Sequence, residues 1–270
     1  MINPFAQVPV FHIASMARSG ETVLLRSLAS HSRIKVVHNL GAHDEAHSEQ
    51  LFEYLKHYQN TKISRKHPYV KPYDVEKGEV LVLKQGVWEH RFPFKGVILS
   101  RNPVAIYASL RNYDADEENS DLDSLWHHNT ARLTRWMRDI DPLLVDELQA
   151  LPPVEQFTLF YNRRMRALAA LGLPVVHYEK FVTNARGVLT TIVNAMGLDF
   201  EDGMLNAHTD YSKGSRGHGK IDMGAALHSG SLYKFQRTLA RDEFDVIVEK
   251  TGEVHRQFGY RLQWDSITVD

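Results

Sequence analysis

The sequence contains no cysteine. This absence excludes disulfide bonds, thiolate catalysis and metal sites with cysteine ligands. The His-Glu-x-x-His pattern of helical zinc sites is also missing, and the histidines are scattered along the chain. We therefore expect no bound metal.

Long apolar runs are missing as well. No window of the sequence approaches the roughly 20 apolar residues that a membrane-spanning helix needs. The N-terminal segment has neither the basic start nor the apolar stretch of a signal peptide. We therefore expect a soluble cytoplasmic protein without a membrane partner.

An excess of charge of one sign is absent too, because the 270 residues carry a formal net charge of −1. This balance gives no indication of a general polyanion-binding surface, and we expect no nucleic-acid partner. A small anionic ligand needs only a local basic site, which net charge does not exclude. With 43% hydrophobic and 24% charged residues, the composition is that of a globular protein with a sizeable core.

Short β-rich runs alternate with helical patterns along the chain, without repeats or an obvious linker. This alternation predicts one α/β domain over residues 1–270, with a central parallel sheet between two helical layers. Ligands of such sheets bind at the carboxyl ends of strands. The expected strands are residues 8–14, 35–38, 79–83, 96–100 and 175–178. The expected helices are residues 22–30, 51–58, a helix from Pro103, and helices within 122–137, 157–168, 188–196 and 244–258.

Residues 15–22 (SMARSGET) lie between an expected strand and an expected helix. Unpaired amides at a helix N-terminus suit a phosphate, and Arg18 adds a permanently charged guanidinium. Gly20 permits close approach of the ligand, while Ser19 and Thr22 offer hydroxyl groups. The segment lacks the Gly-x-x-x-x-Gly-Lys-[Ser/Thr] pattern of ATP- and GTP-binding loops. For this segment alone, a plain strand–helix turn with an exposed arginine remains the alternative.

Residues 97–103 (VILSRNP) form a second strand that ends at a helix start. Arg101 stands at the carboxyl end of the expected strand, and Ser109 lies two helical turns further on. A guanidinium and a hydroxyl group can thus converge on a second anion. Two such positions in one chain favour a ligand with two separate phosphate groups.

Taken together, these segments resemble the sulfotransferases that use 3′-phosphoadenosine 5′-phosphosulfate (PAPS). Arg18-Ser19-Gly20 with Thr22 is similar to the 5′-phosphosulfate loop of that family, and Arg101-Asn102-Pro103 with Ser109 to its 3′-phosphate motif. Residues 177–181 (HYEKF) resemble a segment that ends a strand near the adenine, and residues 237–260 resemble the C-terminal helix with its Leu-Gly-Tyr end. The order of these motifs agrees along nearly the whole chain.

The resemblance implies an α/β domain with a sheet related to that of P-loop kinases, with PAPS as the co-substrate and adenosine 3′,5′-bisphosphate as a product. By position, Arg101 and Ser109 would hold the 3′-phosphate and Tyr178 would lie near the adenine. The residues implied at the 5′-phosphosulfate are Arg18, Ser19, Gly20, Glu21 and Thr22.

The resemblance also points to catalytic groups. Arg18 is the first candidate for the charge on the leaving group, and Lys84 is the second because it follows an expected strand. Cytosolic members carry Lys-Thr-His near such a strand with the histidine as base, whereas this sequence has Lys84-Gln85-Gly86. A base must therefore come from elsewhere, and we expect His38 first, followed by Glu45 and His43.

Two further segments bear on the donor site. Glu21 stands where the family usually has Ser or Thr, and a carboxylate beside phosphate-like anions is repelled unless it points away, pairs with a cation or faces the acceptor. Residues 213–220 (KGSRGHGK) are basic and rich in glycine. They are typical of a loop that closes over a donor, with Lys213 and Arg216 as the 3′-phosphate contacts, although a surface loop has the same composition.

The sequence favours sulfuryl transfer from PAPS to a hydroxyl or amine of a small molecule or glycan. A small-molecule kinase on the same kind of sheet is one alternative, although its loop lysine is missing. A non-catalytic descendant that binds a nucleotide or a partner is the other, and Glu21 and the missing histidine motivate it. The acceptor is not readable from the sequence, and a homo-oligomer is compatible with it.

Overall fold

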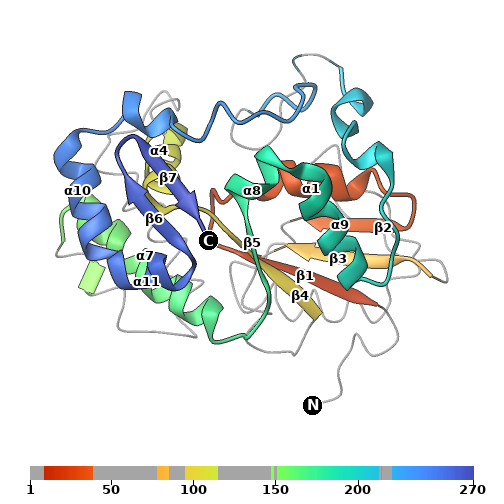
Figure 1. Cartoon of the computed structure of the whole chain (residues 1–270), viewed down its shortest axis with the longest axis horizontal. Helices are drawn as coiled ribbons and strands as arrows, with labels where there is room; N and C mark the ends of the chain where they lie inside the picture. Colours follow the sequence, from red (N-terminus) through yellow and green to blue (C-terminus); the bar gives the residue numbers. More distant parts are fainter. Residues whose placement is uncertain are drawn as a thin grey trace.

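A five-stranded parallel sheet forms the centre of the protein (Figure 1). The computed structural model describes residues 9–38, 78–84, 95–114, 147–148, 151–212, 214 and 221–270. The strand order is β2-β3-β1-β4-β5, and every pairing is parallel. The strands are β1 (Val10–Ser15), β2 (Ile34–His38), β3 (Val80–Lys84), β4 (Lys95–Ser100) and β5 (Val175–His177).

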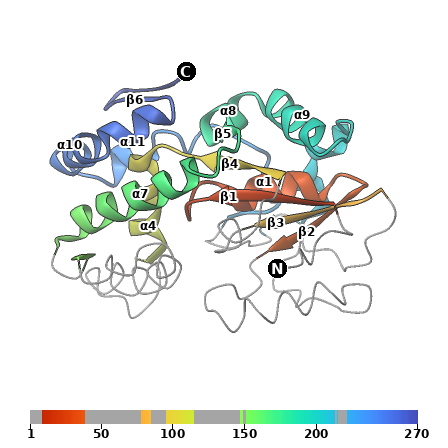
Figure 2. The same ribbon diagram turned by 90° about the horizontal axis from the view of Figure 1, so that it is seen from below.

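Helices cover the sheet in two groups (Figure 2). The first group packs on one face of the sheet, against residues of all five strands, and consists of α1 (Glu21–Ala29), α8 (Tyr178–Thr183) and α9 (Ala185–Ala195). The second consists of α4 (Pro103–Asp114), α7 (Pro153–Ala169), α10 (Arg241–Lys250) and α11 (Gly252–Gln257). Three single turns, η2 (Asp202–Met204), η3 (Ala207–Asp210) and η4 (Lys234–Arg237), connect elements of the C-terminal half.

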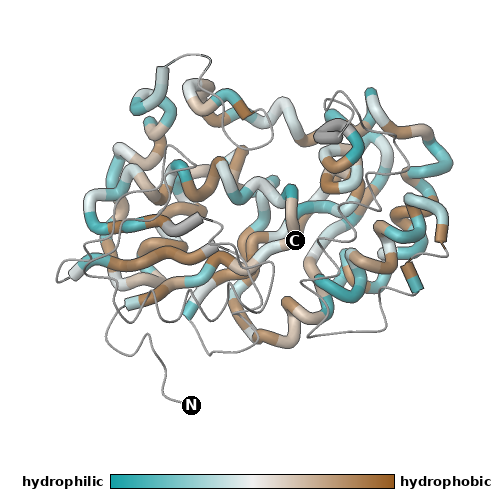
Figure 3. Tube along the Cα trace, turned by 180° about the vertical axis from the view of Figure 1, so that it is seen from behind, coloured by the Kyte–Doolittle hydropathy of each residue, from teal (hydrophilic) through white to brown (hydrophobic). Residues whose placement is uncertain are grey.

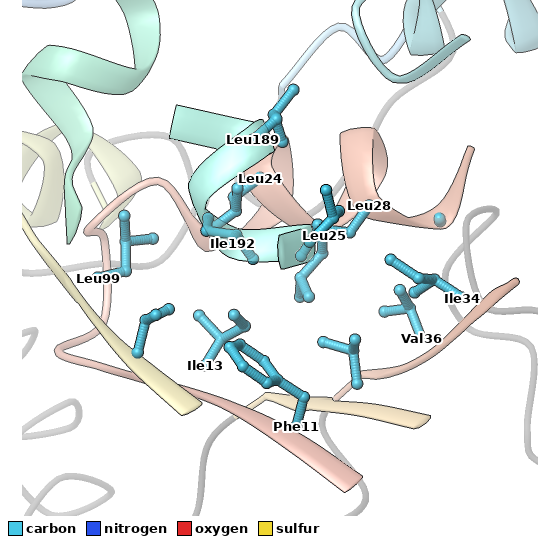
Figure 4. Packing of buried hydrophobic residues seen from close by; sticks show 14 of the residues in the cluster. Phe11, Ile13, Leu24, Leu25, Leu28, Ile34, Val36, Leu99, Leu189 and Ile192 are labelled. Atoms are coloured by element: carbon cyan, nitrogen blue, oxygen red, sulfur yellow. The ribbon is translucent and has the colours of Figure 1, made fainter. Parts of the chain in front are cut away.

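The alternation of side chains along the strands explains these layers. Phe11 and Ile13 of β1 pack against the leucines of α1 and α9, as Figure 4 shows, whereas Ala14 faces the cluster around α4 and α7. In β4, Leu99 joins the first cluster and Ile98 the second. Since successive side chains of a strand point to opposite faces, both faces of the sheet are buried. Hydrophobic residues accordingly concentrate along the strands (Figure 3).

The predicted fold class is confirmed: the structure is an α/β sheet flanked by helices. The five expected strands and the helices that begin near Glu21 and at Pro103 are present, with shifts of one or two residues at their ends. The helices expected over residues 51–58 and 122–137 lie outside the described residues. In the described part, no helix has the length and apolar character needed to cross a membrane.

Two predicted boundaries are wrong. The strand expected over residues 175–178 ends at His177, because Tyr178 starts α8 and packs its ring against Gly20. The single helix expected over residues 244–258 is divided at Thr251, whose hydroxyl donates to the Ile247 carbonyl oxygen at 2.6 Å. A hydroxyl that bonds back to its own helix competes with the regular ladder and bends it.

The C-terminal hairpin was not predicted. It consists of β6 (Tyr260–Gln263) and β7 (Ser266–Val269), which pair in antiparallel fashion. Its first residue, Tyr260, is buried in the cluster around α7 and α10. The hairpin thereby brings the end of the described chain to the same side of the sheet as α4.

The break between α10 and α11 predicts a dependence of stability on pH. Burial lowers the pKa of His255 from 6.5 to about 4, and the neighbouring Arg256 adds to the shift. The Thr251 hydroxyl donates its proton to the Ile247 carbonyl oxygen, so its oxygen accepts from His255 Nδ1–H at 3.1 Å. This bond holds the neutral imidazole with its proton on Nδ1.

Since the folded pKa lies below the unfolded one, the unfolded chain binds more protons between these values. The contribution of His255 to the free energy of unfolding is thus complete above about pH 6.5 and is lost as the pH falls towards 4. Urea titrations at several pH values should show the free-energy difference between the wild type and His255→Gln narrowing over this range. Parallel curves for the two proteins would contradict this account.

Candidate functional site

The loop after β1 lies at the centre of the carboxyl edge of the sheet. β1 is flanked by β3 and β4, and the chain continues through α1 to β2 at one edge, whereas β4 and β5 lie on the other side. Residues 16–20 therefore occupy the switch point at which open α/β sheets bind ligands. The β4–α4 connection with Arg101 is the neighbouring loop on the same edge. Both anion positions expected from the sequence thus lie side by side.

The loop has an unusual backbone conformation before α1, and two of its amides are paired: Ser19 N–H with the Met16 carbonyl oxygen at 3.3 Å and Gly20 N–H with Glu21 Oε2 at 3.1 Å. Arg18 has a φ of 70° and Gly20 one of 98°, so the chain turns twice through the left-handed region. The Gly20 carbonyl oxygen accepts from Val23 and Leu24 N–H, both at 3.2 Å, as an N-cap residue does. Ser19 is fully buried, and its hydroxyl has no hydrogen-bond partner among the described residues. The N-terminus of α1 that follows is a place that suits an anion, because the first amides of a helix have no partner within it.

Gly20 has a second reason to be glycine. A Cβ atom at this position would lie 2.2 Å from Cδ2 of Tyr178, so the ring packs directly on the loop backbone. The ring also contacts the Arg101 guanidinium, which lies 4.4 Å from its centroid. Tyr178 thus joins the two neighbouring loops. Its expected position near the adenine stays a prediction.

Arg101 is a buried cation, 8% exposed. Nη1 donates to the Arg18 carbonyl oxygen at 3.0 Å, and Nη2 points to the Ser231 carbonyl oxygen at 3.4 Å. Nε has no hydrogen-bond partner, and no carboxylate pairs with this guanidinium within the described part of the chain. A buried arginine without a counter-charge is costly, which is typical of a site that receives an anionic ligand.

Arg18 and Ser109 contact each other. Arg18 Nε donates to Ser109 Oγ at 3.0 Å, a bond between the first loop and the middle of α4. The sequence placed these two residues at different phosphates of one ligand. In the structure they form the border between the two positions.

The geometry adds a residue that sequence reasoning missed. Ser231 lies on the segment before η4, its carbonyl oxygen faces Arg101, and its hydroxyl bonds to the Tyr178 hydroxyl at 2.7 Å. The surrounding His-Ser-Gly-Ser sequence has turn composition and was passed over in favour of the basic residues 213–220. Because Tyr178 and Ser231 interact through neutral hydroxyl groups, no charged residue in the sequence indicates this contact.

Glu179 holds the backbone of the second loop in place. Its Oε1 accepts from Asn102 N–H at 3.0 Å and from Asn102 Nδ2 at 2.7 Å, and its Oε2 accepts from the Tyr260 hydroxyl at 2.9 Å. Asn102 Oδ1 in turn accepts from Ala105 N–H, as an N-cap does. The internal carboxylate thus lies at the positive end of α4 and occupies donors there.

Burial keeps the Tyr260 hydroxyl protonated. Burial raises the pKa of Tyr260 well above its ordinary value, and the Glu179 charge adds to the effect. The phenol therefore remains a donor to the carboxylate at all physiological pH values. From the sequence, Tyr178 was the residue of the HYEKF segment predicted to lie in the site, whereas no role was predicted for its neighbour Glu179.

Glu21 lies inside the loop, 4% exposed. Its Oε2 accepts from Gly20 N–H at 3.1 Å and its Oε1 from the Ser15 hydroxyl at 3.2 Å. It does not point away from the loop, which was one of the expectations. Thr22, the next residue, is buried in the first turn of α1.

The candidate catalytic groups are only partly placed. Lys84 ends β3 and His38 ends β2, and the two are register partners. Lys84 is also the partner of Ile13 in β1, so both residues lie at the edge that carries the loop. Their side chains are outside the described residues, as are Glu45, His43, Lys213 and Arg216.

Comparison with solved structures gives the fold a name. The sulfotransferase domain of the Synechococcus PCC 7002 olefin synthase is similar with a TM-score of 0.53 and 17% identity, over 95% of this chain and 96% of that one. Mouse sulfotransferase SULT7A1, complexed with PAP, is similar with a TM-score of 0.52 and 12% identity, over 93% and 84%. No family model matches the sequence, and no curated protein matches it. The chain thus has the fold of sulfotransferase domains.

The contact between Gly20 and Tyr178 predicts that Gly20→Ala lowers the free energy of unfolding by more than the cost of an alanine in the left-handed region alone. An alanine in the left-handed region costs about 1–2 kcal/mol. Gly197→Ala is the matched control, because its φ is 77° and nothing lies within 4 Å of the added Cβ. Urea unfolding should show a clearly larger loss for Gly20→Ala, and equal losses would mean that the ring simply moves aside.

The Glu179 network predicts that Tyr260→Phe destabilises the fold. Removal of the hydroxyl leaves Oε2 of a buried carboxylate without this donor, which costs about 1–3 kcal/mol. Tyr233→Phe is the control, because that hydroxyl accepts a 3.3 Å bond from Ile267 N–H at an exposed position. A loss for Tyr260→Phe no greater than for the control would show that the network contributes little.

Proposed function

We propose that this protein is a PAPS-dependent sulfotransferase that transfers the sulfuryl group to a hydroxyl or amine of a small molecule or glycan. The observation that carries the proposal is the buried Arg101 guanidinium, which has a free Nε and no carboxylate partner in the described part of the chain. It lies beside a loop whose conformation suits a second anion. Two adjacent anion positions match a nucleotide with phosphate groups on both sides of its ribose.

The two positions divide the donor between them. Arg101 and Ser109 would bind the 3′-phosphate, since a guanidinium and a hydroxyl group supply directed donors. The amides at the start of α1 and the Ser19 hydroxyl would bind the 5′-phosphosulfate. Arg18 would stand at the border between the two groups, where its Nε donates to Ser109 Oγ. The SULT7A1 neighbour supports this reading, because it was solved with PAP.

Sulfuryl transfer requires charge stabilisation more than covalent catalysis. The acceptor oxygen or nitrogen forms a bond to sulfur while the bond between sulfur and the bridging oxygen of the 5′-phosphate breaks. The leaving adenosine 3′,5′-bisphosphate gains negative charge, which Arg18 and Lys84 would stabilise. The proton of the acceptor passes to a base, for which His38, Glu45 and His43 are the candidates.

Calorimetric titration with adenosine 3′,5′-bisphosphate tests the proposal. The wild type should bind this nucleotide, and Arg101→Ala should weaken binding about 10–100-fold, the value of a charge-assisted hydrogen bond. Arg261→Ala is the control, because Arg261 pairs with Asp270 on the surface. The same titration with ATP and magnesium addresses the kinase alternative.

The outcomes separate the alternatives. Preference for ATP with magnesium would contradict the proposal in favour of a kinase. Bisphosphate binding without sulfuryl transfer to any member of a broad acceptor panel would favour a non-catalytic protein. An Arg101→Ala variant that binds as tightly as the wild type would remove the observation on which the site rests.

A further inference from the structure

Glu21 occupies a position that has a known electrostatic meaning in phosphate-binding loops. In the Gly-x-x-x-x-Gly-Lys-[Ser/Thr] pattern, the residue after the last glycine is a lysine that reaches the β- and γ-phosphates. When Gly20 is placed on that glycine, Ser15 takes the first position and Thr22 the last. Glu21 then stands at the lysine position. The charge at this point of the loop is inverted.

The carboxylate is held inside the loop by both of its oxygens. Oε1 accepts from the hydroxyl of Ser15, the last residue of β1, and Oε2 accepts from Gly20 N–H, the amide before α1. These contacts join the two ends of the loop, and the side chain is 4% exposed. An anion that uses the Gly20 amide must first displace it.

Displacement leaves the negative charge next to the incoming ligand, because Glu21 is the first residue of α1. Repulsion between like charges grows with the number of charges on the ligand and is strong at a buried site. The phosphosulfate group of PAPS carries fewer negative charges than a triphosphate. The same holds for the 5′-phosphate of adenosine 3′,5′-bisphosphate, which is a single phosphate group. The penalty is therefore smallest for a short, weakly charged 5′ group.

We propose that Glu21 determines donor specificity: it keeps the loop amide occupied and selects against nucleoside triphosphates in favour of the less charged 5′ group of a sulfuryl donor. This inference rests on the proposed function, because it takes a nucleotide as the ligand of the loop. It adds a reason why the loop tolerates a carboxylate at a phosphate site. The same side chain that weakens binding of the donor weakens binding of its most abundant type of competitor more.

The test compares Glu21→Gln and Glu21→Thr with the wild type by calorimetry, with adenosine 3′,5′-bisphosphate and ATP as the two probes. Glutamine keeps the size of the side chain and removes the charge, whereas threonine removes both. Both variants should bind ATP at least 10-fold more tightly than the wild type, and the bisphosphate by a smaller factor. Glu253→Gln is the control for net charge, because Glu253 is 81% exposed and pairs with Arg166 on the surface.

The outcomes distinguish the inference from the proposed function. If the wild type binds the bisphosphate and neither variant changes the ratio of the ATP and bisphosphate affinities by more than twofold, the inference is wrong and the proposed function stands. A change in threonine alone would show a steric effect and also overturn it. If the wild type binds neither probe, the proposed function fails and the inference fails with it. Thermal unfolding of each variant verifies that the loop change leaves the fold intact.

Discussion

The Glu179 carboxylate accepts hydrogen bonds from three groups in two distant segments of the chain, Asn102 at the start of α4 and Tyr260 at the start of β6. Glu179 itself lies one residue after Tyr178, whose ring packs on Gly20. One buried anion thus fixes the relative positions of both loops at the carboxyl edge. Beside these loops lies Arg101, a buried guanidinium that no carboxylate of the described residues pairs with.

The candidate site follows from this arrangement. Arg101 stacks on Tyr178 and holds the loop at the Arg18 carbonyl oxygen, while Ser231 closes the same corner from the C-terminal half. The Gly20 amide donates to a carboxylate of the same loop, that of Glu21. The site therefore combines one attractive element with one repulsive element, and such a combination produces selectivity between ligands of different charge.

Sequence reasoning predicted the sheet, its flanking helices and the two loops, because strand periodicity and helix-start chemistry are local properties. The anchoring of Arg101 by Ser231 and of Asn102 by Glu179 was beyond it, since these contacts join residues 77 or more positions apart. The Glu179–Tyr260 bond depends on a hairpin whose pairing gives only a weak local signal. Glu21 departs from the Ser or Thr expected at its position, but its hydrogen bond with Gly20 N–H is evident only from the folded structure.

The most direct test of the central claim measures how much the 3′-phosphate contributes to binding and whether Arg101 provides that contribution. Adenosine 3′,5′-bisphosphate and adenosine 5′-monophosphate would each be titrated into the wild type and Arg101→Ala. The account predicts that the wild type prefers the bisphosphate by about 10–100-fold, in line with a charge-assisted contact, and that the variant loses most of this preference. An equal preference in both proteins would contradict the assignment of Arg101 to the 3′-phosphate.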